Sequence, residues 1–189
     1  MPSLDPLNLF DKARRVRLAA FDIDGILTDG RLHYSAQGDF SKAFDVRDGL
    51  GMKLLQNAGI ELAIITSRRA DSVRLRAEDL GIAHVLQGVT DKLDAVRGLL
   101  EKNSLDAEEA AFIGDDLVDL PALRLCGLAV TVPGAPALLK RHADYVTRAA
   151  GGRGAVRELC EMILHWRNAS VTGKGGSECN VKQAMAGVS

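Results

Sequence analysis

Short apolar runs alternate with amphipathic segments along most of the chain. Apolar runs of strand length predict buried β-strands at residues 17–21, 60–66, 82–86, 110–113, 128–132 and 145–146. Between them, apolar residues at helical spacing predict helices at residues 48–58, 69–80, 91–102, 117–125, 135–142 and 155–166. Strands that alternate with helices form a parallel sheet covered on both faces. We therefore expect an α/β fold, a Rossmann-like three-layer sandwich with a central parallel sheet.

One stretch departs from this alternation. Residues 32–34 and 40–44 alternate apolar and polar positions on either side of a polar turn, which is typical of a β-hairpin. This hairpin would be an insertion after the first strand, at about residues 31–44. Along the whole chain we expect a lead-in at 1–15, one domain at 16–168 and a disordered tail of small and polar residues at 169–189.

Composition and charge narrow the class of protein. The 189 residues are 47% hydrophobic, enough for one sizeable core, and the formal net charge is −1. A chain without a basic excess is not expected to bind nucleic acid or a membrane surface. Apolar runs stay below membrane-spanning length, and the three cysteines lie far apart without metal-ligand spacing, which is typical of a reducing compartment. We therefore expect a cytoplasmic protein.

Two acidic residues follow the first predicted strand directly. Asp22 and Asp24 stand where that buried strand ends, and Gly25 allows a sharp turn beside them. Burying two carboxylates is costly unless they are paired or bind a metal. Because ligands bind at the carboxyl ends of strands in open parallel sheets, this pair marks a candidate site.

The loops after the later predicted strands each carry a chemically suited group. Thr66 ends the second strand, Lys92 follows the third, and the run Gly-Asp-Asp-Leu-Val-Asp at 114–119 follows the strand at 110–113. Carboxylates at this edge form a hard oxygen-ligand set that suits Mg²⁺. Asp115 would complete the metal site, while Asp119 would orient Lys92 or a metal-bound water.

These groups suit phosphoryl transfer. Asp22 would attack phosphorus as the nucleophile once a metal screens its charge. Asp24 would protonate the leaving alkoxide and later deprotonate water. Thr66 would donate a hydrogen bond to a phosphoryl oxygen, and Lys92 would neutralise charge on the phosphate and the nucleophile.

In the expected order, these residues resemble the four motifs of the haloacid dehalogenase superfamily of phosphatases, and the flanking segments extend the resemblance to about residue 167. Residues 42–49 and 145–158 resemble in particular a capless subclass that acts on an eight-carbon keto-acid sugar phosphate of lipopolysaccharide synthesis. The resemblance implies a Mg²⁺-dependent phosphoric monoester hydrolase that forms a homotetramer and has no cap domain.

The resemblance also assigns roles by position. Asp22 matches the nucleophile and Asp24 the acid/base, while Ser67 stands where the family usually has glycine. The metal ligands would be Asp22, Asp24 through its backbone carbonyl, and Asp115, with Asp116 and Asp119 behind them. The candidate substrate-binding residues are Asp24, Asp45, Val46, Arg47, Asp48, Gly49, Lys53, Arg68, Arg76, Lys92 and Arg153. Together these residues carry more positive charge than one phosphate group requires. The additional charge suits an acid sugar phosphate, which also carries a separate carboxylate.

The spacing of the motifs leaves no room for a lid domain. One hairpin and one helix fill the interval from Asp22 to Thr66, and one helix and one strand fill that from Thr66 to Lys92. An open site encloses a small substrate poorly. We therefore hypothesise that a neighbouring subunit supplies the missing wall through the hairpin and residues 151–154, so that removing residues from 151 onward should impair turnover and spare metal binding.

Three alternatives remain open from the sequence. A phosphatase of a related nine-carbon keto-acid sugar phosphate would keep every catalytic residue. A phospho-accepting signalling domain also uses aspartate, threonine and lysine on a parallel sheet, but it would lack an acid/base at the position of Asp24. A non-catalytic oligomerisation module would have no need to fill all four motifs.

Overall fold

A six-stranded parallel sheet forms the centre of the molecule. The computed structural model describes residues 6–34 and 40–172. The strands lie in the order β5-β4-β1-β6-β7-β8. They are β1 (Leu18–Phe21), β4 (Glu61–Thr66), β5 (His84–Gln87), β6 (Ala110–Ile113), β7 (Leu128–Thr131) and β8 (Tyr145–Val146). The predicted α/β fold with a central parallel sheet is confirmed.

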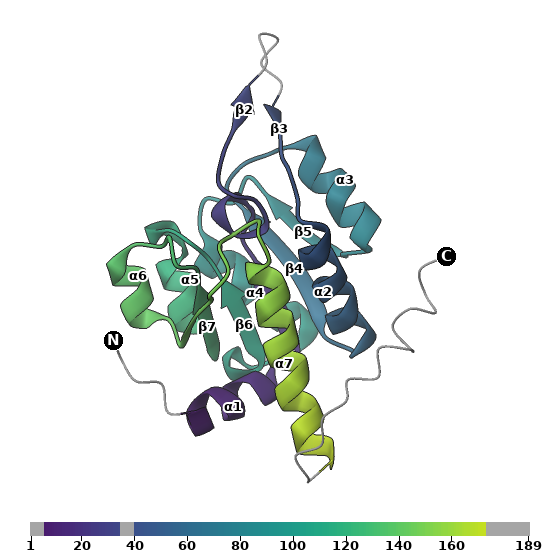
Figure 1. Ribbon diagram of the computed structural model, residues 1–189, viewed down its shortest axis with the longest axis vertical. Helices are drawn as coiled ribbons and strands as arrows, with labels where there is room; N and C mark the ends of the chain where they lie inside the picture. Colours follow the sequence, from purple (N-terminus) through teal and green to yellow (C-terminus); the bar gives the residue numbers. More distant parts are fainter. Residues whose placement is uncertain (1–5, 35–39, 173–189) are drawn as a thin grey trace.

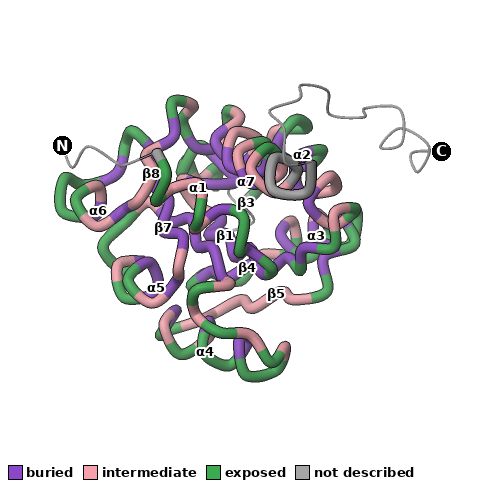
Figure 2. The backbone as a smooth tube through the Cα atoms, turned by 90° about the horizontal axis from the view of Figure 1, so that it is seen from below, coloured by how far each residue is buried: buried purple, intermediate pink, exposed green. Residues whose placement is uncertain are grey.

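Helices cover both faces of this sheet. α2 (Val46–Asn57) and α7 (Ala155–Thr172) lie together on one side of it, and α4 (Lys92–Asn103) and α5 (Leu120–Leu125) lie on the other (Figure 2). α3 (Asp71–Leu80) packs beside α2, and α6 (Ala137–His142) packs beside α5 and β7. This covering explains why β1, β6 and β7 are buried along their whole length.

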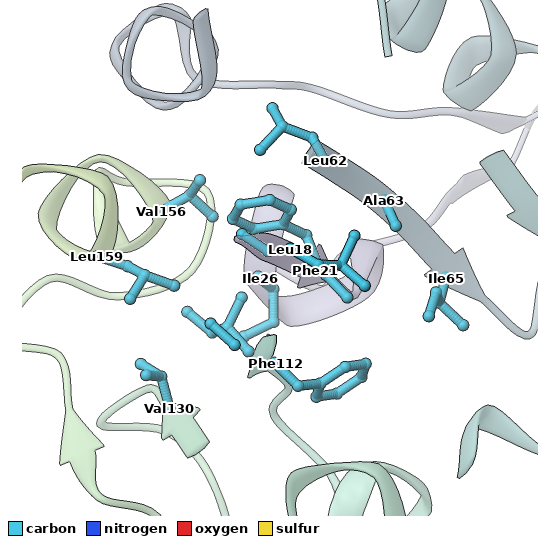
Figure 3. Close-up of a cluster of buried hydrophobic side chains, with 14 of the residues drawn as sticks. Leu18, Phe21, Ile26, Leu62, Ala63, Ile65, Phe112, Val130, Val156 and Leu159 are labelled. Carbon is cyan, nitrogen blue, oxygen red and sulfur yellow. The ribbon is translucent and has the colours of Figure 1, made fainter. Parts of the chain in front are cut away.

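The core lies between the sheet and these helices. Leu18, Phe21 and Phe112 on the central strands are fully buried. Val156 and Leu159 on α7 are buried to the same extent. Figure 3 shows Val156 and Leu159 extending from α7 toward the sheet, while the ring of Phe112 points away from α7. Burying one such side chain stabilises the fold by about 1.5–3 kcal/mol, which makes α7 part of the core rather than an appendage.

The predicted hairpin is present beside the sheet. β2 (His33–Tyr34) and β3 (Phe40–Ser41) pair antiparallel, with His33 opposite Ser41. The hairpin projects beyond the edge where the sheet strands end (Figure 1). Its expected turn at 35–39 lies outside the described residues.

Several element boundaries differ from those expected, and three of the differences concern α2, α5 and α7. α2 begins at Val46, two residues early, because the side chain of Asp45 accepts a hydrogen bond from Arg47 N at 2.7 Å and caps the helix. The expected helix at 117–125 is a short 3₁₀ turn, Leu117–Asp119, followed by α5. α7 continues to Thr172, past the expected domain end at 168, and the remainder of the expected tail lies outside the described residues.

The lead-in is also helical where it is described. α1 (Pro6–Arg15) packs against α7, with the ring of Phe10 centred 5.3 Å from that of Trp166 and Ala13 fully buried. Cys126 and Cys160 are free and buried, and Cys179 lies outside the described residues. Among the described residues, every helix is too short or too polar to cross a membrane.

Candidate active site

Three neighbouring strands bring the motif residues to one edge of the sheet. β1 lies between β4 and β6, and Phe21 pairs in register with Ile64 and Ile113, so the three strands end at nearly the same level. Asp22, Thr66 and the 114–119 loop therefore lie side by side at this edge of the sheet. Lys92 begins α4, after β5, the next strand outward.

The turn after β1 brings its residues against Asp115. This turn spans Ile23–Leu27. Within it Gly25 has a φ of +86°, a backbone conformation that residues with a side chain rarely adopt. A Cβ on Gly25 would lie only 1.9 Å from Oδ2 of Asp115. Glycine is therefore required both for the backbone conformation and for the close approach of the carboxylate.

Lys92 links two of the buried carboxylates. Its Nζ lies 2.7 Å from Oδ1 of Asp22 and 2.5 Å from Oδ1 of Asp119. All three side chains are buried. The side chain of Asp91 accepts hydrogen bonds from the backbone N–H groups of residues 93 and 94 and caps α4 at this point. A buried ion pair of this kind holds its members firmly, because removing one partner leaves an uncompensated buried charge.

Asp119 also organises the loop that carries Asp115. Its Oδ2 accepts hydrogen bonds from the backbone N–H groups of Asp115 at 3.0 Å and Asp116 at 3.1 Å. Both Asp119 oxygens thus have partners, which supports the expected orienting role and leaves fewer lone pairs for a metal. Asp116 itself is exposed, and its side chain caps the following turn at Leu117 N.

The acidic cluster fits a divalent cation. Oxygens of Asp22, Asp115 and Asp119 lie within 4.8 Å of one another, and Lys92 supplies one ammonium to these three carboxylates. Two negative charges are therefore uncompensated when all the groups are ionised. Hard carboxylate oxygens suit Mg²⁺, and because both oxygens of Asp119 already have partners, Asp22 and Asp115 are the candidate ligands.

Burial, together with neighbouring carboxylates, raises the pKa values of both candidate metal ligands. Burial raises the pKa of Asp22 to about 6, against the attraction of Lys92. Burial, followed by the charges of Asp22 and Asp119, raises the pKa of Asp115 to about 7. Burial lowers the pKa of Lys92, but the two carboxylates that it contacts outweigh this effect and raise it above its ordinary value. Lys92 thus remains charged beside carboxylates whose burial makes their ionisation costly.

Asp24 lies between two cations. Arg68 Nε is 3.4 Å from its Oδ2, and the buried amine of Lys42 forms an ion pair with its Oδ1. Arg68 was among the expected site residues, but Lys42 was not. The available signal was the alternation of the hairpin, which puts Lys42 on one face with Phe40 and Phe44, an unusual place for a lysine without a partner.

Thr66 and Ser67 form the beginning of the loop after β4. Thr66 is buried, and its Oγ1 accepts a hydrogen bond from Arg68 N at 3.3 Å, which closes a tight turn. Ser67 has no positive φ. Serine therefore fits this position without strain, although the family usually has glycine there.

Residues 45–49 begin α2 near the same edge, but their carboxylates already have protein partners. Asp45 pairs with Arg47, whose guanidinium lies 2.7 Å from Oδ2 and is two-thirds exposed. Asp48 is buried, and its oxygens accept hydrogen bonds from the N–H groups of Gly154 and Arg157 at the start of α7. The Asp48 carboxylate therefore joins α2 to α7.

The remaining expected substrate residues divide into two groups. Arg76 lies against Gly49, where a Cβ would approach Arg76 Nη2 to 2.1 Å, and Val46 is exposed on the first turn of α2. Lys53 is not brought to this edge. Its Nζ lies beside Gly81, which ends α3 ahead of β5 at the opposite edge of the sheet.

The segment 151–154 packs on the nucleophile turn of its own chain. Gly152 N donates to Ile26 O at 2.8 Å, and a Cβ on Gly151 would lie 1.7 Å from Gly25 O. The carbonyl of Arg153 accepts a hydrogen bond from Arg47, while the Arg153 side chain is exposed. The segment is therefore an intrachain wall of the site. The truncation expected to spare metal binding would also remove α7 and its core residues, so it cannot isolate this role.

Comparisons with known proteins agree with this geometry. A family model described as haloacid dehalogenase-like hydrolase matches residues 79–159. The chain is 48% identical over 153 residues to 3-deoxy-D-manno-octulosonate 8-phosphate phosphatase of Escherichia coli K12, covering 81% of each chain. It is 46% identical over 157 residues to the enzyme of that name from Yersinia pestis, covering 83% of this chain and 84% of the other.

Solved structures show the same likeness. The phosphatase of that name from Moraxella catarrhalis, in complex with magnesium ion, phosphate ion and KDO, superposes with a TM-score of 0.85 at 45% identity, covering 87% of this chain and 94% of the other. The cobalt-bound phosphatase from Haemophilus influenzae superposes with a TM-score of 0.81 at 41% identity, covering 86% and 96%.

Proposed function

This chain belongs to the haloacid dehalogenase-like hydrolases, and we propose that it hydrolyses 3-deoxy-D-manno-octulosonate 8-phosphate to the free sugar acid and inorganic phosphate. The observation that carries the proposal is the meeting of Asp22, Thr66, Lys92 and Asp115 at one sheet edge. The likeness to phosphatases of that name extends over four fifths of the chain. The product is a sugar of lipopolysaccharide, which places the reaction in lipopolysaccharide synthesis.

The chain's own groups divide the reaction into two steps. An Asp22 oxygen attacks phosphorus, and the ester oxygen leaves with a proton from Asp24, which gives an aspartyl-phosphate. Asp24 then removes a proton from water, whose oxygen attacks phosphorus and releases Asp22. Lys92, held by Asp22 and Asp119, neutralises charge that builds up on the phosphoryl group. Thr66 lies beside the same position and can donate its hydroxyl.

A magnesium ion would be held by the carboxylates of Asp22 and Asp115, with the backbone carbonyl of Asp24 as the third protein ligand that the family likeness suggests. When bound, it supplies positive charge that screens the nucleophile from the anionic phosphate. The uncompensated charge of the cluster and the raised pKa values of its acids support this assignment.

The substrate would lie across the exposed cations at the rim of the site. Arg68 lies beside Asp24, Arg47 donates to the carbonyl of Arg153 in the segment that packs on the nucleophile turn, and Arg76 lies against Gly49. Guanidinium groups pair with carboxylates as well as phosphates, so one group of cations can take the phosphate and another the sugar carboxylate. Lys53 has no part in this arrangement within one chain.

The assembly belongs to the proposal as well. We infer a cytoplasmic homotetramer built from a domain at residues 16–168, with α1 packed on it. Among residues 6–34 and 40–172 no lid domain stands between the motifs, and the hairpin projects beyond the edge where the sheet strands end (Figure 1); both observations support a neighbouring subunit as a further wall. The free, buried Cys126 and Cys160 fit a reducing compartment. Light scattering on the purified protein tests the subunit number.

The direct test is a free-phosphate assay on the purified protein. We expect release of phosphate from the eight-carbon substrate with Mg²⁺, loss of release after chelation, and slower release from a related nine-carbon keto-acid sugar phosphate. Asp22→Asn should abolish turnover, because an amide oxygen cannot act as the nucleophile. Faster turnover of the nine-carbon substrate would reassign the substrate, and substantial activity in Asp22→Asn would overturn the nucleophile.

A further inference from the structure

Lys42 is a buried lysine that directly contacts the expected acid/base. It follows β3 in the chain, and its side chain is only 1% exposed. A buried ammonium requires a charged or strongly polar partner, because its desolvation is costly. Here the amine forms an ion pair with Oδ1 of Asp24. The hairpin is thus connected to the turn that follows β1.

The other oxygen of Asp24 faces Arg68, in the loop after β4. Arg68 Nε lies 3.4 Å from Oδ2, and Arg68 follows Thr66 by two residues. The Arg68 side chain is half exposed, so its ion pair with Asp24 is weak and easily exchanged for a bound anion. The two oxygens therefore differ: a buried cation holds Oδ1, while a half-exposed cation lies near Oδ2.

The backbone around Asp24 gives little help in fixing its side chain. Asp24 has φ −76° and ψ 117°, and the next residue, Gly25, has φ +86°, so neither continues a regular helix. Asp24 is also 23% exposed in its side chain. A carboxylate at such a position can rotate unless another group holds it.

We propose that Lys42 is a positioning residue for the reaction, which holds Oδ1 of Asp24 so that Oδ2 faces the leaving-group oxygen. This inference rests on the proposed phosphatase function. In the first step, the Asp22 oxygen forms a bond to phosphorus, the bond from phosphorus to the ester oxygen breaks, and the proton on Oδ2 of Asp24 passes to that oxygen. In the second step, Oδ2 takes a proton from water, the remaining hydroxide oxygen bonds to phosphorus, and the bond to Asp22 breaks.

Two substrates with different leaving groups can show whether Lys42 positions Asp24 or only supports the site in general. An alkoxide, such as that of the sugar phosphate, needs a proton as it leaves, whereas p-nitrophenolate leaves without one. With enzyme in excess over substrate, release of the first product reports the phosphorylation step alone. The experiment compares this single-turnover rate for 3-deoxy-D-manno-octulosonate 8-phosphate and for p-nitrophenyl phosphate, with Mg²⁺, in the full chain.

Lys42→Met keeps most of the side-chain volume and removes the charge. Because general acid–base catalysis typically contributes about 10²–10⁴-fold, we expect the sugar phosphate rate to fall about 10-fold or more, and p-nitrophenolate release to stay within about 3-fold of wild type. Lys42→Arg should restore part of the lost rate on the sugar phosphate, since it keeps the charge. Lys12→Met is the matched control, because Lys12 forms an ion pair with Asp144 far from the site; it should change neither rate.

Each result decides the proposal. An equal loss on both esters, or no loss on either, would overturn the positioning role. If Lys42→Met does not fold, Lys42→Gln, which keeps a hydrogen-bond donor, must show the same selective loss on the sugar phosphate. Failure of the proposed function is distinguishable, because wild-type protein would then release no free sugar acid from 3-deoxy-D-manno-octulosonate 8-phosphate.

Discussion

Gly151→Ala tests whether the segment 151–154 supports the nucleophile turn or merely leads into α7. Gly151 is buried, and a Cβ on it would lie 1.7 Å from Gly25 O and 2.4 Å from Gly25 C. Both obstructing atoms belong to the backbone, so no flexible side chain can move aside. The two segments must separate by roughly an ångström or more for the methyl group to fit.

The cost of this separation follows from the contacts that it breaks. Overpacking costs about 1–3 kcal/mol, and loss of the hydrogen bond from Gly152 N to Ile26 O costs about 0.5–1.5 kcal/mol. We expect Gly151→Ala to lower the free energy of unfolding by about 2–4 kcal/mol, or the Tm by roughly 5–15 °C. The turn would also move relative to Asp115, and since a displacement of about 1 Å can cost 10²-fold, kcat/KM should fall by about 100-fold.

Urea unfolding and steady-state phosphate release measure the two effects. Gly98→Ala is the matched control, because Gly98 is exposed within α4, has no positive φ and would meet nothing within 4 Å. It should stabilise the protein by about 0.5–1 kcal/mol and leave kcat/KM unchanged. If Gly151→Ala matches wild type in both stability and kcat/KM, the segment is only a linker and the reasoning fails.

Two further predictions concern the charged groups of the site. Asp119→Asn should lower kcat about 10–100-fold, because an amide cannot neutralise Lys92 or orient it as the carboxylate does; steady-state kinetics check this, and an unchanged kcat would contradict it. In chelator-treated protein, the free energy of unfolding should fall as pH rises from about 4 to about 7. The pKa values of Asp22 (about 6) and Asp115 (about 7) are raised in the folded state. In this pH range the folded state therefore holds protons that the unfolded state has released. Mg²⁺ should therefore raise the Tm more at pH 8 than at pH 5, where protons compete for the same oxygens; an equal shift in thermal melts at both pH values would count against the metal assignment.

Local pattern predicted the elements well but not all of their ends. Apolar runs located the central strands β1, β6 and β7 well, because a parallel strand covered on both faces is continuously apolar. The start of α2 was misplaced because it depends on the cap by Asp45. The extent of α7 was underestimated, and residues 1–15 were expected only as a lead-in, because the contact of α1 with α7, including Phe10 against Trp166, joins the two ends of the described chain.

The candidate site shows the same division. Asp22, Lys92 and Asp115 could be found from the sequence, since each stands at or after a strand end and the topology of a parallel sheet brings such positions together. Lys42 and the carboxylate of Asp48 could not be assigned in that way. Their partners, Asp24 and the start of α7, lie 18 and more than 100 residues away and were not implied by spacing.

The sequence by itself therefore determined the class of chemistry, because residue types and their places after strands follow from local pattern. Only the tertiary structure decided how the turn at Asp22 is held. Gly151 and Gly152 lie against it, Lys42 reaches Asp24 from the hairpin, and Asp48 joins α2 to the segment behind it. These contacts depend on close approach of backbones and on the pairing of buried charges. Both arise only when distant segments pack together.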